Sequence, residues 1–130
     1  PSIYVELEMK YDVSRLITLK SQVSGKELIR FGGVIFTSST NTTINTLEDI
    51  KNKSFVAVDA ESFGGWQTEW KEFLDHGIDP YKEFAKLDFA GTQEQTVYKV
   101  LSGEYDAGAT RTGILEELAQ EGKIKLSFSR

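Results

Sequence analysis

Apolar and polar residues alternate along the second half of the chain in a pattern that occurs three times. Each unit begins with a short apolar run typical of a buried strand, passes through a polar turn into an amphipathic stretch, and ends at glycine. The expected strands are Phe55–Val58, Phe84–Phe89, Tyr105–Thr110 and a final Ile124–Phe128; the expected helices follow the Gly64-Gly65 turn and cover Gln93–Ser102 and Gly113–Glu121.

Strands that alternate with helices predict right-handed crossovers, which build a mainly parallel sheet with helices on both faces. The expected fold class is therefore α/β, a three-layer α/β/α unit. Ligands of such sheets bind outside the carboxyl ends of the strands, where each turn enters a helix. Three turns then face one edge of the sheet: Asp59–Gly65, Ala90–Gln95 and Thr110–Gly113.

The first half of the chain carries weaker signals. Ile3, Val5, Leu7, Met9 and Tyr11 alternate as in a strand, but three of them also match helical spacing. The Pro-Ser start and two early glutamates favour the helix. Further along we expect strands at Arg15–Val23 and Lys26–Ser38, and a short helix Leu47–Lys51 capped by Thr46. Gly32-Gly33 in the second of these strands indicates a bend or a place where the backbone packs closely.

With 130 residues, 39% hydrophobic and 27% charged, the chain has the size and composition of one soluble globular domain. A net charge of −5 argues against a nucleic-acid surface, and the absence of cysteine excludes disulfides and thiolate chemistry. No apolar run approaches the ~20 residues of a membrane span, and no signal peptide is recognisable. Because the chain starts at Pro1 without methionine, we expect a piece of a longer protein.

The sequence lacks the groups that most enzymes require. The single imidazole, His76, lies at an expected helix end marked by Gly77, where a cation stabilises the helix dipole without any further role. There is no nucleophile elbow, no Walker lysine and no metal-ligand spacing among the carboxylates. We therefore expect a binding protein with no catalytic residues, no metal and no cofactor.

The stretch from Ser54 to Gln67 is the most promising candidate site. The first N–H groups of a helix have no partner within it, and the helix dipole is positive there, so a strand-turn-helix junction attracts anions. Alternatively, Ser62 is only a helix cap and Gly64-Gly65 only a close contact with a strand. Inward carboxylates of Asp59 and Glu61 would favour an amine instead; the turn can aim them at water, so we give the helix starts more weight.

The candidate ligand-binding residues are mainly neutral donors at the three turns, because donors without a nucleophile suit recognition better than turnover. Arg111 would clamp an oxyanion or form a surface ion pair, with similar expectation for both. The helix after Gly65 is expected to bury Trp66, Trp70, Phe73 and Leu74 on one face. The full candidate set is Ser62, Phe63, Gly64, Gly65, Thr92, Gln93, Thr110, Arg111 and Thr112.

An ordered series of motifs resembles the second lobe of phosphonate-type periplasmic binding proteins. The series covers nearly the whole chain: Gly33–Thr37, Leu47–Lys51 with Lys53–Ala57, Asp59–Gly65, His76–Pro80, Gly91–Glu94 and Val100 through Asp106–Gly108. The tail Thr110–Ile124 resembles a subgroup that serves as the extracytoplasmic sensor of membrane histidine kinases. The resemblance also implies a helical start, so we expect Ser2–Lys10 to be helix.

The resemblance implies a type 2 periplasmic-binding-protein fold, in which a small anionic solute is clamped between two lobes. Residues 1–130 would be one such lobe, and its partners would be a small anionic or polar solute and the missing first lobe. Its membrane attachment would come only through the parent protein. The alternatives are the solute receptor of an ABC importer and an enzyme lobe of the same fold. Three positions depart from the family pattern: Phe63 replaces a hydroxyl, Gln93 a histidine and Gly113 an acidic residue.

Overall fold

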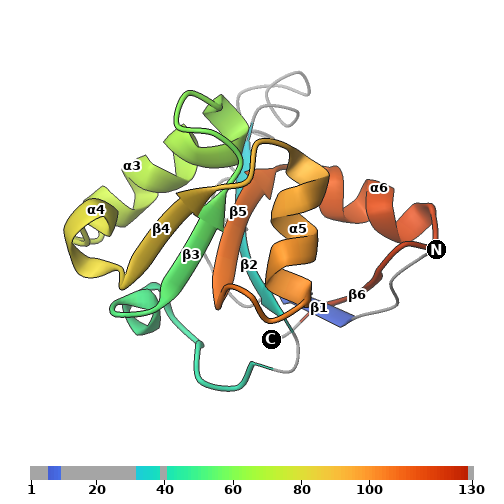
Figure 1. The fold of residues 1–130 in the computed structure, drawn as a ribbon, viewed down its shortest axis with the longest axis horizontal. Helices are drawn as coiled ribbons and strands as arrows, with labels where there is room; N and C mark the ends of the chain where they lie inside the picture. The colour runs from blue at the N-terminus through green and yellow to red at the C-terminus, as the bar shows by residue number, and fades with distance from the viewer. Residues whose placement is uncertain (1–5, 10–31, 39–40, 129–130) are drawn as a thin grey trace.

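The computed structural model describes residues 6–9, 32–38 and 41–128 of the chain. Among them is a six-stranded sheet in the order β4-β3-β5-β2-β1-β6 (Figure 1). The strands are β1 Glu6–Met9, β2 Gly33–Ser38, β3 Ser54–Ala57, β4 Lys86–Phe89, β5 Ala107–Arg111 and β6 Lys125–Phe128. The helices are η1 Leu47–Ile50, η2 Phe63–Gln67, α3 Thr68–Asp75, α4 Pro80–Glu83, α5 Gln93–Leu101 and α6 Ile114–Gln120.

The sheet is mainly parallel, as the alternation of strands and helices predicts. β3 pairs in parallel with both β4 and β5, and β1 pairs in parallel with β6. β2 is the exception, because it runs antiparallel to β5 on one side and to β1 on the other. As a result the carboxyl ends of β3, β4 and β5 share one edge of the sheet, with the start of β2 beside them (Figure 1).

The expected helix at Ser2–Lys10 is wrong over the residues that the structure describes. Glu6–Met9 forms β1, which pairs with Ser38 and Thr37 of β2 and with the whole of β6. The strand-like alternation therefore prevails over the helical spacing, because two neighbouring strands satisfy the backbone of this segment. The expected strand Arg15–Val23 and residues 26–31 of the second expected strand lie outside the described residues.

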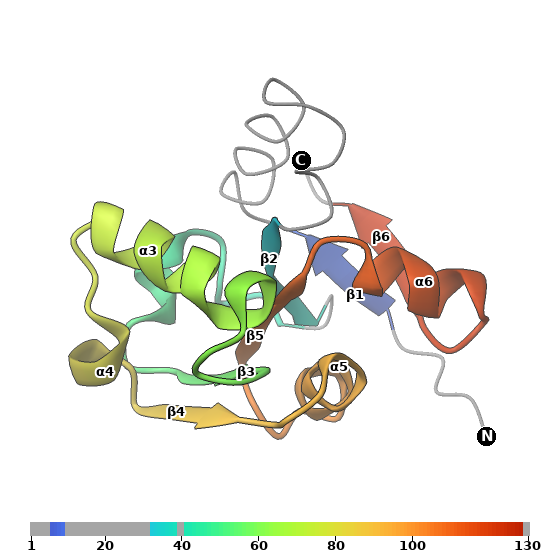
Figure 2. The same cartoon turned by 90° about the horizontal axis from the view of Figure 1, so that it is seen from above.

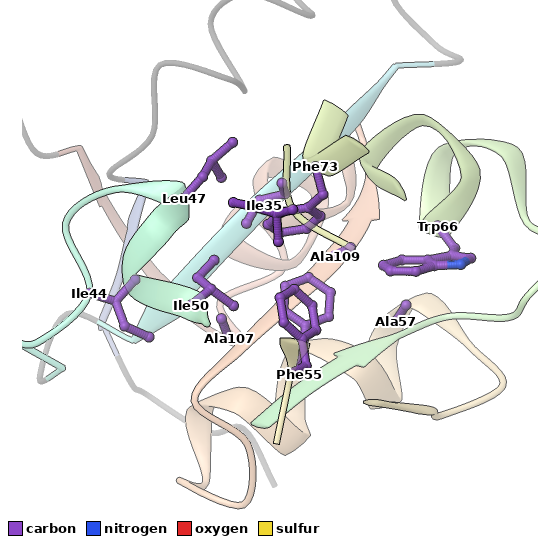
Figure 3. Packing of buried hydrophobic residues seen from close by; sticks show 12 residues of the cluster. Ile35, Ile44, Leu47, Ile50, Phe55, Ala57, Trp66, Phe73, Ala107 and Ala109 are labelled. Carbon is purple, nitrogen blue, oxygen red and sulfur yellow. The ribbon is translucent and has the colours of Figure 1, made fainter. Parts of the chain in front are cut away.

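One face of the sheet is covered by an aromatic core beneath η2, α3 and α4. Phe55 of β3 lies 5.6 Å from Phe73 and 5.9 Å from Trp66, measured between ring centroids. The sheet also contributes Ile35, Ala57, Ala107 and Ala109 to this cluster, which Figure 3 shows from close by. The burial of these large side chains places η2 firmly against the sheet.

The opposite face is covered by α5 and α6 with smaller aliphatic residues. Val34, Phe36 and Val56 of the sheet pack in one cluster with Val97 and Leu115 of the two helices. Figure 2 shows α3 and α4 on one side of the twisted strands β2 to β5, and α5 on the other. The described elements thus form the three expected layers.

Two local expectations in the second half need correction. The strand expected at Phe84–Phe89 begins only at Lys86, because the preceding residues Pro80–Glu83 form α4. Asp79 caps this helix, and its carboxylate accepts a hydrogen bond from Tyr81 N at 3.1 Å. Leu74, expected on the buried face of α3, is 48% exposed, whereas Trp66 and Phe73 are fully buried.

No helix among the described residues is long and apolar enough to cross a membrane.

Candidate functional site

The glycine turn after β3 is a tightly built helix start. Ser62 is the N-cap of η2, and its hydroxyl accepts from Gly65 N at 3.0 Å. The backbone oxygen of Ser62 accepts from both Trp66 N and Gln67 N, at 3.0 and 2.9 Å, which widens the first turn into a π-helix. Such π-turns are frequent at functional sites, and this one continues directly into α3.

Two N–H groups at this helix start, those of Phe63 and Gly64, have no acceptor among the described residues. The phenyl ring of Phe63 is 58% exposed, whereas Gly64 is buried. Gly64 lies so close to its neighbours that a Cβ there would stand 2.7 Å from Arg111 Cβ and 2.9 Å from Gly32 O. The glycine therefore lets the turn rest directly on the end of β5.

The second turn is joined to the same place by a side-chain amide. Thr92 caps α5, and its hydroxyl accepts from Gln95 N at 3.1 Å. Gln93 Oε1 accepts from Arg111 N at 3.0 Å, which ties the start of α5 to the end of β5. With its oxygen held there, the amide NH2 of Gln93 remains as a donor at the sheet edge.

The third turn supplies Arg111, which touches both of the others. Its backbone meets Gln93 on one side and its Cβ faces Gly64 on the other. Its guanidinium bonds Thr112 O at 3.3 Å and Glu117 at 3.4 Å. Of the two roles predicted for Arg111, oxyanion clamp or surface ion pair, this structure shows the ion pair, with Glu117 as the partner.

The hydroxyl groups of Thr110 and Thr112 are more buried than expected for ligand-binding residues. Thr110 is fully buried, and its hydroxyl, like that of Thr112, has no hydrogen-bond partner among the described residues. Of the candidate set, the structure thus brings Gly64, Gln93 and Arg111 into contact. Ser62 and Thr92 act as caps beside them.

The acidic residues of the first turn lie at the surface. Asp59 and Glu61 are exposed, and the carboxylate of Asp59 accepts from Glu61 N at 2.9 Å.

His76 lies at the far end of α3, with Nε2 3.4 Å from Glu72 and Nδ1 3.8 Å from Glu48. Within the described part of the chain no group of three metal-ligating side chains could hold a metal ion.

Sequence analysis missed Glu69, a carboxyl group buried beside this turn. The side chain has no exposed surface, and neither of its oxygens has a hydrogen-bond partner among the described residues. Burial raises the pKa of Glu69 well above its usual range, against a weaker opposing effect of the Glu69 and Val34 N–H groups. A signal was available, because Glu69 falls between Trp66, Trp70 and Phe73 on the expected buried face.

Substitution of Gly64 tests how tightly the turn rests on β5. Gly64→Ala is expected to lower the free energy of unfolding by about 1–3 kcal/mol, because the new methyl group meets backbone that cannot yield. Urea denaturation measures the loss, with Gln67→Ala, at an exposed position in the same turn, as the control. Equal stability of the two variants would contradict the close contact.

The chain is similar in sequence to one protein family and to one sensor kinase. The sequence model of the family described as "ABC transporter, phosphonate, periplasmic substrate-binding protein" matches residues 1–127. The chain is 29% identical over 125 residues to the tetrathionate sensor histidine kinase TtrS of Salmonella typhimurium, a match that covers 95% of this chain and 21% of that protein.

The fold also resembles a solved structure. PhnD1 from Prochlorococcus marinus in complex with methylphosphonate matches with a TM-score of 0.64 and 24% identity. The match covers 72% of this chain and 37% of that chain. The chain therefore spans about a fifth of the sensor kinase and about a third of the binding protein.

Proposed function

The chain belongs to the family of phosphonate periplasmic substrate-binding proteins of ABC transporters, and from this premise we propose that it is the second of two ligand-recognition lobes. It binds a small oxyanion at the shared carboxyl edge of β3 and β5, and it has no catalytic role of its own. The parent protein is an extracytoplasmic sensor attached to the membrane outside this segment, most simply a two-component histidine kinase. The first lobe closes over the anion from the other side.

The observation that carries this proposal is the pair of unpartnered N–H groups at Phe63 and Gly64. They stand at the positive end of a continuous helical segment, η2 followed by α3, and the turn is held in place by its contact with Arg111. Donors that already lack acceptors bind an anion with little reorganisation. The acidic residues of the turn, Asp59 and Glu61, are exposed, so water screens their charge.

The cap hydroxyls of Ser62 and Thr92 support the same proposal. Each accepts one N–H bond through its oxygen, so the hydroxyl proton remains available to donate to a ligand oxygen. Gln93 NH2 is a third neutral donor at this edge. Neutral donors stabilise an anion without fixing its charge, which suits sulfur or phosphorus oxyanions alike.

The test is calorimetric titration of the full two-lobed protein with methylphosphonate, inorganic phosphate, methanesulfonate and tetrathionate. Replacing both Ser62 and Thr92 by alanine is expected to weaken binding by about 1.5–3 kcal/mol for each lost charge-assisted bond. Ser102→Ala is the matched control, because Ser102 bonds Lys99 O at the opposite end of α5. Unchanged affinity in the double variant, with folding intact, would remove this edge as the site.

A second candidate for the parent protein is the solute receptor of an ABC importer. The family description and the structural resemblance to PhnD1 favour it, whereas the sequence similarity to a sensor kinase over 95% of the chain favours sensing. The complete gene separates the two. A kinase core after the binding lobes supports the sensor, and a secreted protein that ends after the lobes supports the importer.

A further inference from the structure

Glu69 is a buried titratable side chain beside the proposed anion site, and the proposed function leaves it unused. It lies on α3, and its carboxyl group occupies the space above Gly33, the first residue of β2. A Cβ at position 33 would stand 2.8 Å from Oε1 and 2.5 Å from Cδ of Glu69. The glycine thus leaves room for this carboxyl group, and the contact fixes where the group lies.

This position puts the carboxyl group directly behind the glycine turn. Gly33 pairs with Arg111 in the sheet, and Gly32 O stands 2.9 Å from where a Cβ on Gly64 would be. Because neighbouring Cα atoms are ~3.8 Å apart, the carboxyl group of Glu69 lies within roughly 10 Å of the backbone N–H group of Gly64. A charge on Glu69 therefore acts electrostatically on an anion bound at the site.

No described cation neutralises Glu69. β2 and η2, which pack against α3, carry no ionisable side chain. On β5, Arg111 directs its guanidinium to Thr112 O and Glu117 instead. The remaining ionisable groups are Lys71, Glu72, Asp75 and His76 on α3 itself and Tyr81, Lys82 and Glu83 on α4, and none of them bonds Glu69.

We infer that Glu69 sets the charge preference of the proposed anion site by remaining protonated, so that binding of an anion is coupled to retention or uptake of one proton. The inference rests on the proposed function. A neutral carboxyl group behind the turn leaves the helix start attractive to anions. A carboxylate in the same place repels them, and two unit charges roughly 10 Å apart at an effective dielectric constant of about 20 change affinity by about tenfold.

The experiment titrates the full two-lobed protein with tetrathionate and methanesulfonate between about pH 5 and about pH 8, because these anions keep a constant charge over that range. As pH rises through the range in which Glu69 ionises, wild-type affinity is expected to fall by about tenfold, while Glu69→Gln keeps the low-pH affinity throughout. Asp75→Asn, which neutralises an exposed carboxylate on the same helix paired with Lys71, should follow the wild type.

A second measurement needs no variant. Titration in two buffers of different ionisation enthalpy counts protons, and net uptake on binding at the upper pH is expected for the wild type. Both measurements extend to the pH at which the difference in unfolding free energy between wild type and Glu69→Gln stops changing, which marks Glu69 as ionised. Binding of either anion that is still independent of pH there and takes up no proton would overturn the role of Glu69 and leave the site intact. Absence of binding at every pH, in wild type and Glu69→Gln alike, would overturn the proposed function and this inference with it.

Discussion

Replacement of Trp66 by alanine is expected to lower the free energy of unfolding by about 3–5 kcal/mol, the range measured when large aromatic side chains are removed from cores. Trp66 has no exposed surface, and its ring stacks on Trp70 at 6.2 Å between centroids and meets Phe55 at 5.9 Å. It also donates Nε1–H to the hydroxyl of Tyr81 at 3.1 Å. The substitution therefore opens a cavity and removes a hydrogen bond together.

Urea denaturation followed by far-ultraviolet circular dichroism measures this loss without relying on the tryptophan signal. Leu74→Ala is the matched control, because Leu74 lies on the same helical segment but is 48% exposed. We expect it to change the free energy of unfolding by less than about 0.5–1 kcal/mol. If Trp66→Ala lowered the free energy of unfolding by as little as the control does, η2 would not anchor the site to the sheet.

Neutralisation of Glu69 is expected to make the chain more stable at neutral and higher pH. The folded chain keeps the Glu69 proton to a higher pH than the unfolded chain does, because burial raises the pKa of this carboxyl group well above its usual value near 4.5. Between these two pKa values the unfolded state binds fewer protons, so stability falls as pH rises, by about 1.4 kcal/mol per pH unit.

Urea denaturation of wild type and Glu69→Gln over a pH series measures this effect as a difference between the two proteins. The two are expected to be similar in stability near pH 4, with the variant increasingly more stable above that, up to the folded-state pKa of Glu69. Asp75→Asn should retain the wild-type pH dependence, since Asp75 is an exposed partner of Lys71. A difference between wild type and Glu69→Gln that does not change with pH would show that Glu69 carries no raised pKa.

Apart from the short helix α4, the sequence by itself determined the order of strands and helices in the second half of the chain. The strand, turn and helix around Phe55 to Phe73, the cap at Thr92 and the glycines that follow α3, α5 and α6 all follow from local patterns, and the structure confirms them. Local signals suffice here because apolar periodicity, capping residues and left-handed glycines act within one or two turns. The α/β class and the shared edge of the three turns follow from that order.

Tertiary structure decided what depends on neighbours distant in the sequence. Glu6–Met9 is a strand because β2 and β6 pair with it, although its spacing also suits a helix. β2 runs against β5, so Gly33 comes to lie beside Arg111, and α3 then places the carboxyl group of Glu69 above Gly33. The sequence shows Glu69 on an apolar helical face. Only the packed structure leaves it without a hydrogen-bond partner among the described residues, because the charge of a buried group depends on what surrounds it in space.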